Sequence, residues 1–301
     1  MPKEITLGPF AALRRVPLTG YRWDAGLRRA PLGELWAHDR RDRGDAPWLV
    51  GPALGERFDA LQYPPLAIPN LHRRFAALKP TEAAIKKFAD RFGMLGHGTA
   101  LVSPDPSPQP VRIGESFTFW VAEIERMAHL LSVWDLVRRR DAGKLGQMVV
   151  WRGASVSVEW HGQNGARRLV LLARKGVLGD ELLERWRPGD VTEPARYHVC
   201  REINKQLHGH VSPAVLPFRR GDVYLVPDCL LAAMYVRFAL EVSGQQRPAQ
   251  MCRECGRYFI PTHGLQQYCE ARCRKRRFAR RRREEAGATP PPGCEGAVPL
   301  C

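Results

Sequence analysis

Four cysteines near the C-terminus constrain this chain more than any other feature of its sequence. They follow the pattern Cys-x2-Cys-x13-Cys-x3-Cys and comprise Cys252, Cys255, Cys269 and Cys273. Four thiolates can surround a tetrahedral metal ion at about 2.3 Å and leave no coordination position open. The pattern therefore predicts one structural zinc ion, Zn2+, bound by these four side chains.

The spacing of the cysteines also predicts the local structure around the ion. Gly256 directly follows the first pair and tolerates the left-handed backbone that a tight metal-binding knuckle needs. Tyr258-Phe259 and Gln267-Tyr268 are expected to form the two strands of a hairpin. Cys269 and Cys273 are four residues apart, so a helix that begins at Cys269 presents both on one face. The predicted order is knuckle, hairpin and helix.

This order resembles treble-clef-like zinc fingers. Among them it is similar to the C-terminal finger of bacterial CGNR-type regulators, over about residues 250–284. The sequence has Arg274-Lys275-Arg276 where the CGNR signature has Gly-Asn-Arg, so only the arginine matches. The resemblance implies a bacterial protein that binds DNA or regulates transcription.

Positive charge is concentrated in the same segment. The chain has a net charge of +16, and residues 246–286 hold 12 Lys or Arg against 4 Asp or Glu. A local positive field attracts polyanions, and the arginine fork matches phosphate geometry. We therefore expect nucleic acid as the partner, with DNA preferred over RNA. The predicted contact residues are Arg257, Arg274, Lys275, Arg276, Arg277, Arg280, Arg281, Arg282 and Arg283. The alternative for this run is a solvated basic tail.

The body of the chain, residues 1–245, has the pattern of an α+β domain: mainly helical, with a small antiparallel sheet. Apolar residues at three- and four-residue steps predict helices after Thr81, over 114–140, over 192–207 and over 229–242. Alternation around Val156–Trp160 and Arg168–Leu172 predicts a hairpin. The first 60 residues are expected to be irregular, and the proline-rich residues 99–112 are a candidate hinge.

Several residues of the body could suggest chemistry but have a simpler explanation. His208 and His210 flank Gly209 at a predicted helix end, where cationic side chains cap backbone carbonyls. Cys200 and Cys229 lie on apolar helical faces and are interpreted as inert core thiols. Since no catalytic motif is found, we do not expect an enzyme.

The sequence also limits the compartment and the partners. No stretch offers the roughly 20 apolar residues of a membrane span, and the first residues do not resemble a secretion signal. We therefore expect a cytoplasmic protein without a membrane partner, which could form a homodimer. Residues 286–301 are rich in proline and glycine and are expected to be a disordered tail.

The sequence favours a DNA-binding transcription regulator, with 246–285 as the zinc finger and basic helix. Two other classes stay open. The finger could bind RNA or another protein, since exposed aromatic residues beside a knuckle can stack unpaired bases. Alternatively, the body could be an enzyme, such as a nuclease, that the finger anchors to DNA.

Overall fold

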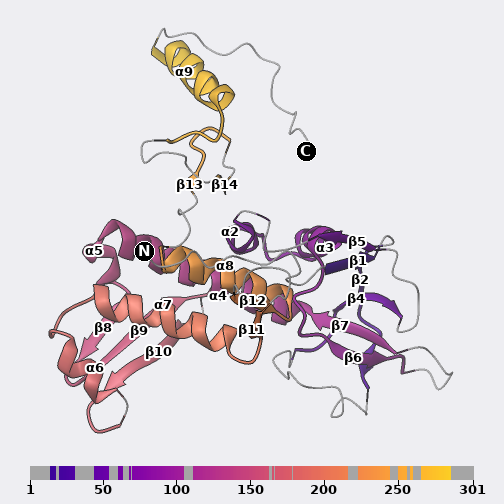
Figure 1. Ribbon diagram of the computed structural model, residues 1–301, viewed down its shortest axis with the longest axis horizontal. Helices are drawn as coiled ribbons and strands as arrows, with labels where there is room; N and C mark the ends of the chain where they lie inside the picture. Colours follow the sequence, from indigo (N-terminus) through magenta and orange to yellow (C-terminus); the bar gives the residue numbers. More distant parts are fainter. Residues whose placement is uncertain are drawn as a thin grey trace. The chain divides into compact units, whose positions relative to one another are not determined.

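The computed structural model divides the chain into two compact units, a body of residues 1–246 and a C-terminal module of residues 247–301 (Figure 1). The structure describes residues 14–17, 20–30, 44–53, 60–63, 68, 70–104, 111–162, 165, 167–177, 179–215, 223–244, 250–255, 258–259 and 266–285. The predicted disordered tail, residues 286–301, lies outside these ranges. The two units are described separately below.

An antiparallel sheet forms one part of the body. Its strand order is β2-β4-β7-β6-β3. The strands are β2 (Arg22–Asp24), β3 (Arg28–Arg29), β4 (Trp48–Ala53), β6 (Thr99–Val102) and β7 (Arg112–Ser116). A separate pair joins β1 (Arg14–Pro17) to β5 (Ala60–Tyr63).

These strands correct the expectation that the first 60 residues are irregular. Trp48 in β4 is paired with Ser116 in β7, far along the chain. Such strands are too short to show a period, and their partners are distant in sequence. The candidate hinge, residues 99–112, contains β6 and the first residue of β7, which pair with each other in the same sheet, while its residues 105–110 lie outside the described ranges.

The helix expected over 114–140 begins later, as α4 (Phe117–Arg139). Ser116 caps it, since its side chain accepts a hydrogen bond from the Phe119 amide. Gly114 belongs to β7, where an added Cβ would lie 2.5 Å from Leu101 and 2.8 Å from Val50. Glycine therefore allows β7 to pack closely between its neighbours.

The other described helices of the body include three that the apolar periodicity predicted, after Thr81, over 192–207 and over 229–242, and three short ones that it did not. They are α2 (Leu71–Ala76), α3 (Glu82–Phe92), α5 (Ala142–Leu145), α6 (Asp180–Arg185), α7 (Thr192–Leu207) and α8 (Leu230–Val242). Thr81 caps α3 as expected, by accepting from the Ala84 amide. Gly93, with φ +88°, ends the helix. In the described part of the chain, no helix is both long enough and apolar enough to cross a lipid bilayer.

A second sheet lies at the other end of the helical layer from the first (Figure 1). It contains β8 (Val149–Arg152), β9 (Ser155–His161) and β10 (Arg167–Arg174), all antiparallel. The predicted hairpin is confirmed, with Arg168 opposite Trp160. Another pair joins β11 (Val211–Val215) to β12 (Val223–Pro227).

One hydrophobic core joins these layers. It includes Trp120 and Met127 of α4, Phe238 of α8, Val158 of β9 and Leu49 of β4. The structure therefore has the predicted α+β class, but the described strands form several antiparallel sheets rather than one small sheet.

The C-terminal module contains β13 (Gln250–Met251), β14 (Tyr258–Phe259) and α9 (Ala271–Glu285). Here the expected hairpin is wrong in its partner. Tyr258 pairs with Met251, and Gln267-Tyr268 has no strand structure. The two strands that pair lie on either side of the first cysteine pair.

Candidate metal centre and basic groove

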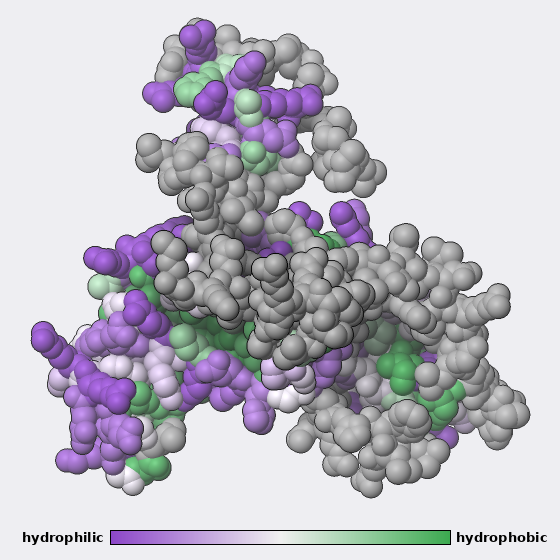
Figure 2. All heavy atoms as spheres, in the orientation of Figure 1, coloured by the Kyte–Doolittle hydropathy of each residue, from purple (hydrophilic) through white to green (hydrophobic). Residues whose placement is uncertain are grey.

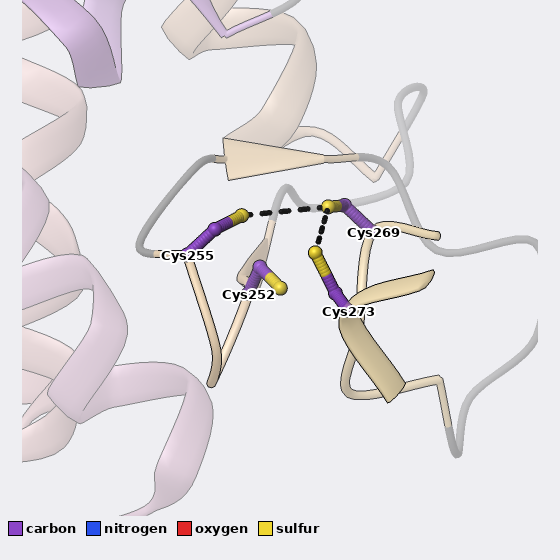
Figure 3. Close-up of side chains that lie close together, drawn as sticks. All are labelled: Cys252, Cys255, Cys269 and Cys273. Carbon is purple, nitrogen blue, oxygen red and sulfur yellow. Dashed lines mark hydrogen bonds between the residues drawn. The ribbon is translucent and has the colours of Figure 1, made fainter. Parts of the chain in front are cut away.

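The four cysteines come together from two separate segments of the C-terminal module. Cys252 directly follows β13 and Cys255 lies in the turn after it, while Cys269 precedes α9 and Cys273 lies in the first turn of that helix. Their side chains point toward one another (Figure 3). The predicted ligand set is therefore assembled by a turn and a helix start.

The distances between the sulfur atoms fit a metal ion. Cys269 Sγ lies 3.6 Å from the Sγ atoms of both Cys255 and Cys273. All four sulfur atoms lie within 4.8 Å of one another. A tetrahedral ion with sulfur ligands at 2.3 Å separates the sulfurs by about 3.8 Å. The cluster can therefore hold one four-coordinate ion after small side-chain movements.

Without a bound ion, the cluster disfavours the thiolate form of Cys269. Burial, followed by hydrogen bonds to the neighbouring thiols, raises the pKa of Cys269 above its usual value. A bound cation reverses this effect, because a coordinated thiol loses its proton. Metal binding would thus replace crowded thiols by neutralised thiolates.

The basic residues singled out by the sequence lie mostly on α9. Figure 2 shows mainly hydrophilic side chains over this helix. The exposed members are Arg274, Lys275, Arg276, Arg280, Arg281 and Arg282, whereas Arg277 is half-buried. Arg257 and the side chain of Arg283 lie outside the described residues.

Arg280 has a structural partner in the knuckle. The Arg280 guanidinium lies 3.4 Å from the carboxylate of Glu254, which sits between the first two cysteines. Arg280 therefore connects the third turn of α9 to the knuckle. This contact reduces the availability of Arg280 for an external phosphate.

A groove of about 630 Å³ runs beside α9. Its lining residues are Arg253, Gln267, Tyr268, Arg277, Phe278 and Arg281. Phe278 is 57% exposed, an unusual state for a large apolar side chain. The groove therefore combines three arginines with two aromatic rings.

Four of the six groove residues were not among the predicted nucleic-acid contacts: Arg253, Gln267, Tyr268 and Phe278. Arg253 lies in the knuckle, and a hydrogen bond from its amide to the Gln267 carbonyl joins the knuckle to the segment that precedes Cys269. Phe278 interrupts the basic run. An apolar residue within so charged a helix was the sequence feature that could have indicated a groove residue. Arg277 and Arg281 were predicted, and their four-residue spacing places them on one helical face.

Comparisons with protein-family models, with curated proteins and with solved structures find no match for this chain.

Proposed function

We propose that the C-terminal module is a treble-clef-like zinc finger that binds nucleic acid, and that the protein is a bacterial DNA-binding transcription regulator. The observation that carries this proposal is the groove in which Arg253, Arg277 and Arg281 lie beside Tyr268 and Phe278. Guanidinium groups bind the phosphates of duplex and single strands alike, and the aromatic rings offer faces to unpaired bases.

Zinc is the metal that this ligand set favours. Thiolates are soft ligands, and four of them in a tetrahedral arrangement are typical of a structural zinc site. The ion would hold the knuckle against the start of α9, since each of these segments supplies two cysteines. It would thereby fix Arg253 opposite the arginines of the helix.

The helix supplies the attraction for phosphates. Residues 271–285 contain nine Lys or Arg and two Glu, and the Lys275 and Arg276 side chains are exposed. Such contacts position a nucleic acid without reading its sequence. We therefore expect affinity to depend strongly on salt.

For duplex DNA we predict a slope of log K against log salt near −4.5, which corresponds to about five neutralised phosphates. The double substitution Arg277→Ala/Arg281→Ala should make the slope shallower by about 1.8, because each lost phosphate contact contributes about 0.9. Fluorescence anisotropy with a labelled duplex, between 50 and 200 mM salt, measures the slope.

The matched control is Arg272→Ala/Arg276→Ala. It removes the same charge at the same spacing from exposed positions of α9 that do not line the groove. The control should change the slope less than the groove variant does. Equal effects would show that α9 attracts DNA by its overall charge and that the groove is not the binding surface.

A second candidate function, binding of unpaired bases, is favoured by the exposed ring of Phe278. Phe278→Ala should weaken single-strand binding by about 1–3 kcal/mol per stacked base and leave duplex affinity nearly unchanged. Competition between single-stranded and duplex oligonucleotides measures the difference. The control Leu169→Ala removes a comparably exposed apolar side chain, 55% exposed, from the body. A loss confined to duplex binding would argue against stacking.

A further inference from the structure

Three metal-ligating side chains meet in the body, far along the chain from the four-cysteine cluster. His97 lies between α3 and β6, His210 lies in the turn after α7, and Cys229 is the N-cap residue of α8. One ligand atom from each lies within 4.8 Å of the other two. From the sequence, His210 was interpreted as a helix-end residue and Cys229 as a core thiol, and no role was predicted for His97.

The geometry between His97 and Cys229 matches a shared ion. Nε2 of His97 lies 3.5 Å from Sγ of Cys229. A tetrahedral zinc ion with sulfur at 2.3 Å and nitrogen at about 2.05 Å places these two ligand atoms about 3.5 Å apart. Both residues are 3% exposed, so the contact is shielded from water.

His210 brings the outer partner that histidine ligands usually have. Its Nδ1 lies 3.0 and 3.2 Å from the two carboxylate oxygens of Asp228. A carboxylate that accepts from Nδ1 fixes the tautomer in which Nε2 carries the lone pair, and makes that nitrogen a better ligand. The rings of His210 and His97 are 4.9 Å apart.

The backbone around His97 is held in place before any ion binds. The carboxylate of Glu115, which is fully buried, accepts hydrogen bonds from the amides of Leu95, Gly96 and His97. The Leu95 carbonyl accepts from the amide of Leu231 in the first turn of α8. The loop that carries His97 is thus tied directly to the helix that carries Cys229.

A capping role alone does not explain why residue 229 is cysteine. Its sulfur accepts from the Ala232 amide at 3.3 Å, but serine, threonine, aspartate and asparagine are the residues that favour this position. A nucleophilic thiol beside an imidazole would need access for a substrate, which the 3% exposure of Cys229 denies. A single ion needs much less space.

We propose that His97, His210 and Cys229 form a second metal site, which takes one zinc-like divalent ion. Imidazole and thiolate together suit zinc better than magnesium or calcium, which prefer oxygen ligands. Asp228 orients His210 from behind. Three protein ligands leave one coordination position for water or a small ligand, in contrast to the closed four-thiolate cluster.

The test is metal analysis of the full-length chain after equilibration with zinc and removal of loosely bound ions. We expect two ions per chain in the natural protein and one in each of Cys229→Ser and His210→Ala. Serine keeps an oxygen for the helix cap, so Cys229→Ser preserves the fold around α8. Cys200→Ser is the control, because Cys200 is half-buried in α7 and outside both clusters. It should retain two ions.

A second measurement separates this site from the finger. All eight tryptophans of the chain lie in the body, so tryptophan fluorescence reports on its unfolding alone. A chelator should lower the unfolding temperature of the natural body and leave that of His210→Ala unchanged, because an ion that binds only the folded state stabilises it. Asp228→Asn should weaken zinc binding about 10- to 100-fold.

Two results would overturn the proposal. One is a natural chain that holds a single ion, which Cys269→Ala abolishes while His210→Ala does not. The other is fast alkylation of Cys229 in zinc-saturated protein, which would identify a free thiol beside His97. Neither outcome depends on whether the finger binds nucleic acid.

Discussion

Replacing Cys269 with alanine is expected to unfold the C-terminal module while the body stays folded. Cys269 Sγ lies 3.6 Å from the Sγ atoms of Cys255 and Cys273, so its loss removes a ligand that contacts both cysteine pairs. The described secondary structure of the module consists of two short strands and one highly charged helix, which offer little apolar surface to bury. Its folding free energy should therefore come from zinc, which contributes on the order of 10–16 kcal/mol in small finger peptides.

The position of the tryptophans makes this prediction easy to check. In Cys269→Ala the tryptophan-monitored unfolding of the body should be unchanged, because residues 247–301 contain no tryptophan. Metal analysis should show the loss of one ion. Nucleic-acid affinity should fall and its salt dependence should flatten, because an unfolded module no longer holds Arg253 opposite Arg277 and Arg281.

Cys200→Ser serves again as the control for loss of a thiol, and it should alter none of these measurements. The idea fails if Cys269→Ala retains its full metal content. It also fails if the variant binds DNA with unchanged affinity and salt slope, since the basic helix would then act without the metal.

The metal centre could be predicted because its information is local. Cys252 and Cys255 are separated by two residues, and Cys269 and Cys273 by one helical turn, so chain geometry alone brings each pair together. The strand pairing around the knuckle could not be predicted from the local sequence. Gln250-Met251 contains no alternation, and only the structure identifies it as the partner of Tyr258-Phe259.

Features that depend on distant residues could not be predicted. His97 and Cys229 are 132 positions apart, and neither has a local pattern that suggests a ligand. The strands of the first 60 residues were missed for the same reason, since Trp48 finds its partner only at Ser116. By contrast, the buried residues of α3 and α4 recur at helical spacing in the sequence. Both helices were therefore predicted, with small errors at their ends.

The body is expected to lose stability as the pH falls from 7 to 5, because of a buried pair of histidines. Nε2 of His129 in α4 lies 3.1 Å from Nε2 of His198 in α7, and Trp160 of β9 stacks on His129 with ring centres 3.9 Å apart. Two ring nitrogens can share this hydrogen bond only if at least one of them is unprotonated.

Burial dominates the titration of both rings. Burial, together with the charges of His198 and Arg168, lowers the pKa of His129 to about 3. Burial lowers the pKa of His198 to about 4, and although Glu202 opposes the shift, Arg201 and Lys205 add to it. In the unfolded chain both rings titrate near pH 6.5. The unfolded state therefore binds more protons below this pH, and the native state loses stability as the pH falls.

The expected loss between pH 7 and pH 5 is about 2 kcal/mol for each histidine. In His198→Gln, one titrating group is removed while the amide can still donate to His129, so the loss due to this pair should be roughly halved. Urea unfolding followed by tryptophan fluorescence, with a chelator present at every pH, measures the stability of the body without a metal contribution.

Two groups in the body need separating from this effect. Burial alone would raise the pKa of Glu241. Its interactions with His72 and with Arg73, which donates a hydrogen bond to it, outweigh burial and lower the pKa to about 2. It stays ionised in the native state throughout this pH range. Burial lowers the pKa of His72, which acts in the same direction as the pair but remains in the variant. The difference between the natural chain and His198→Gln therefore isolates the pair.

The control His208→Gln removes an exposed histidine and should keep the full loss. If His198→Gln also keeps the full loss, the destabilisation in acid arises elsewhere in the body.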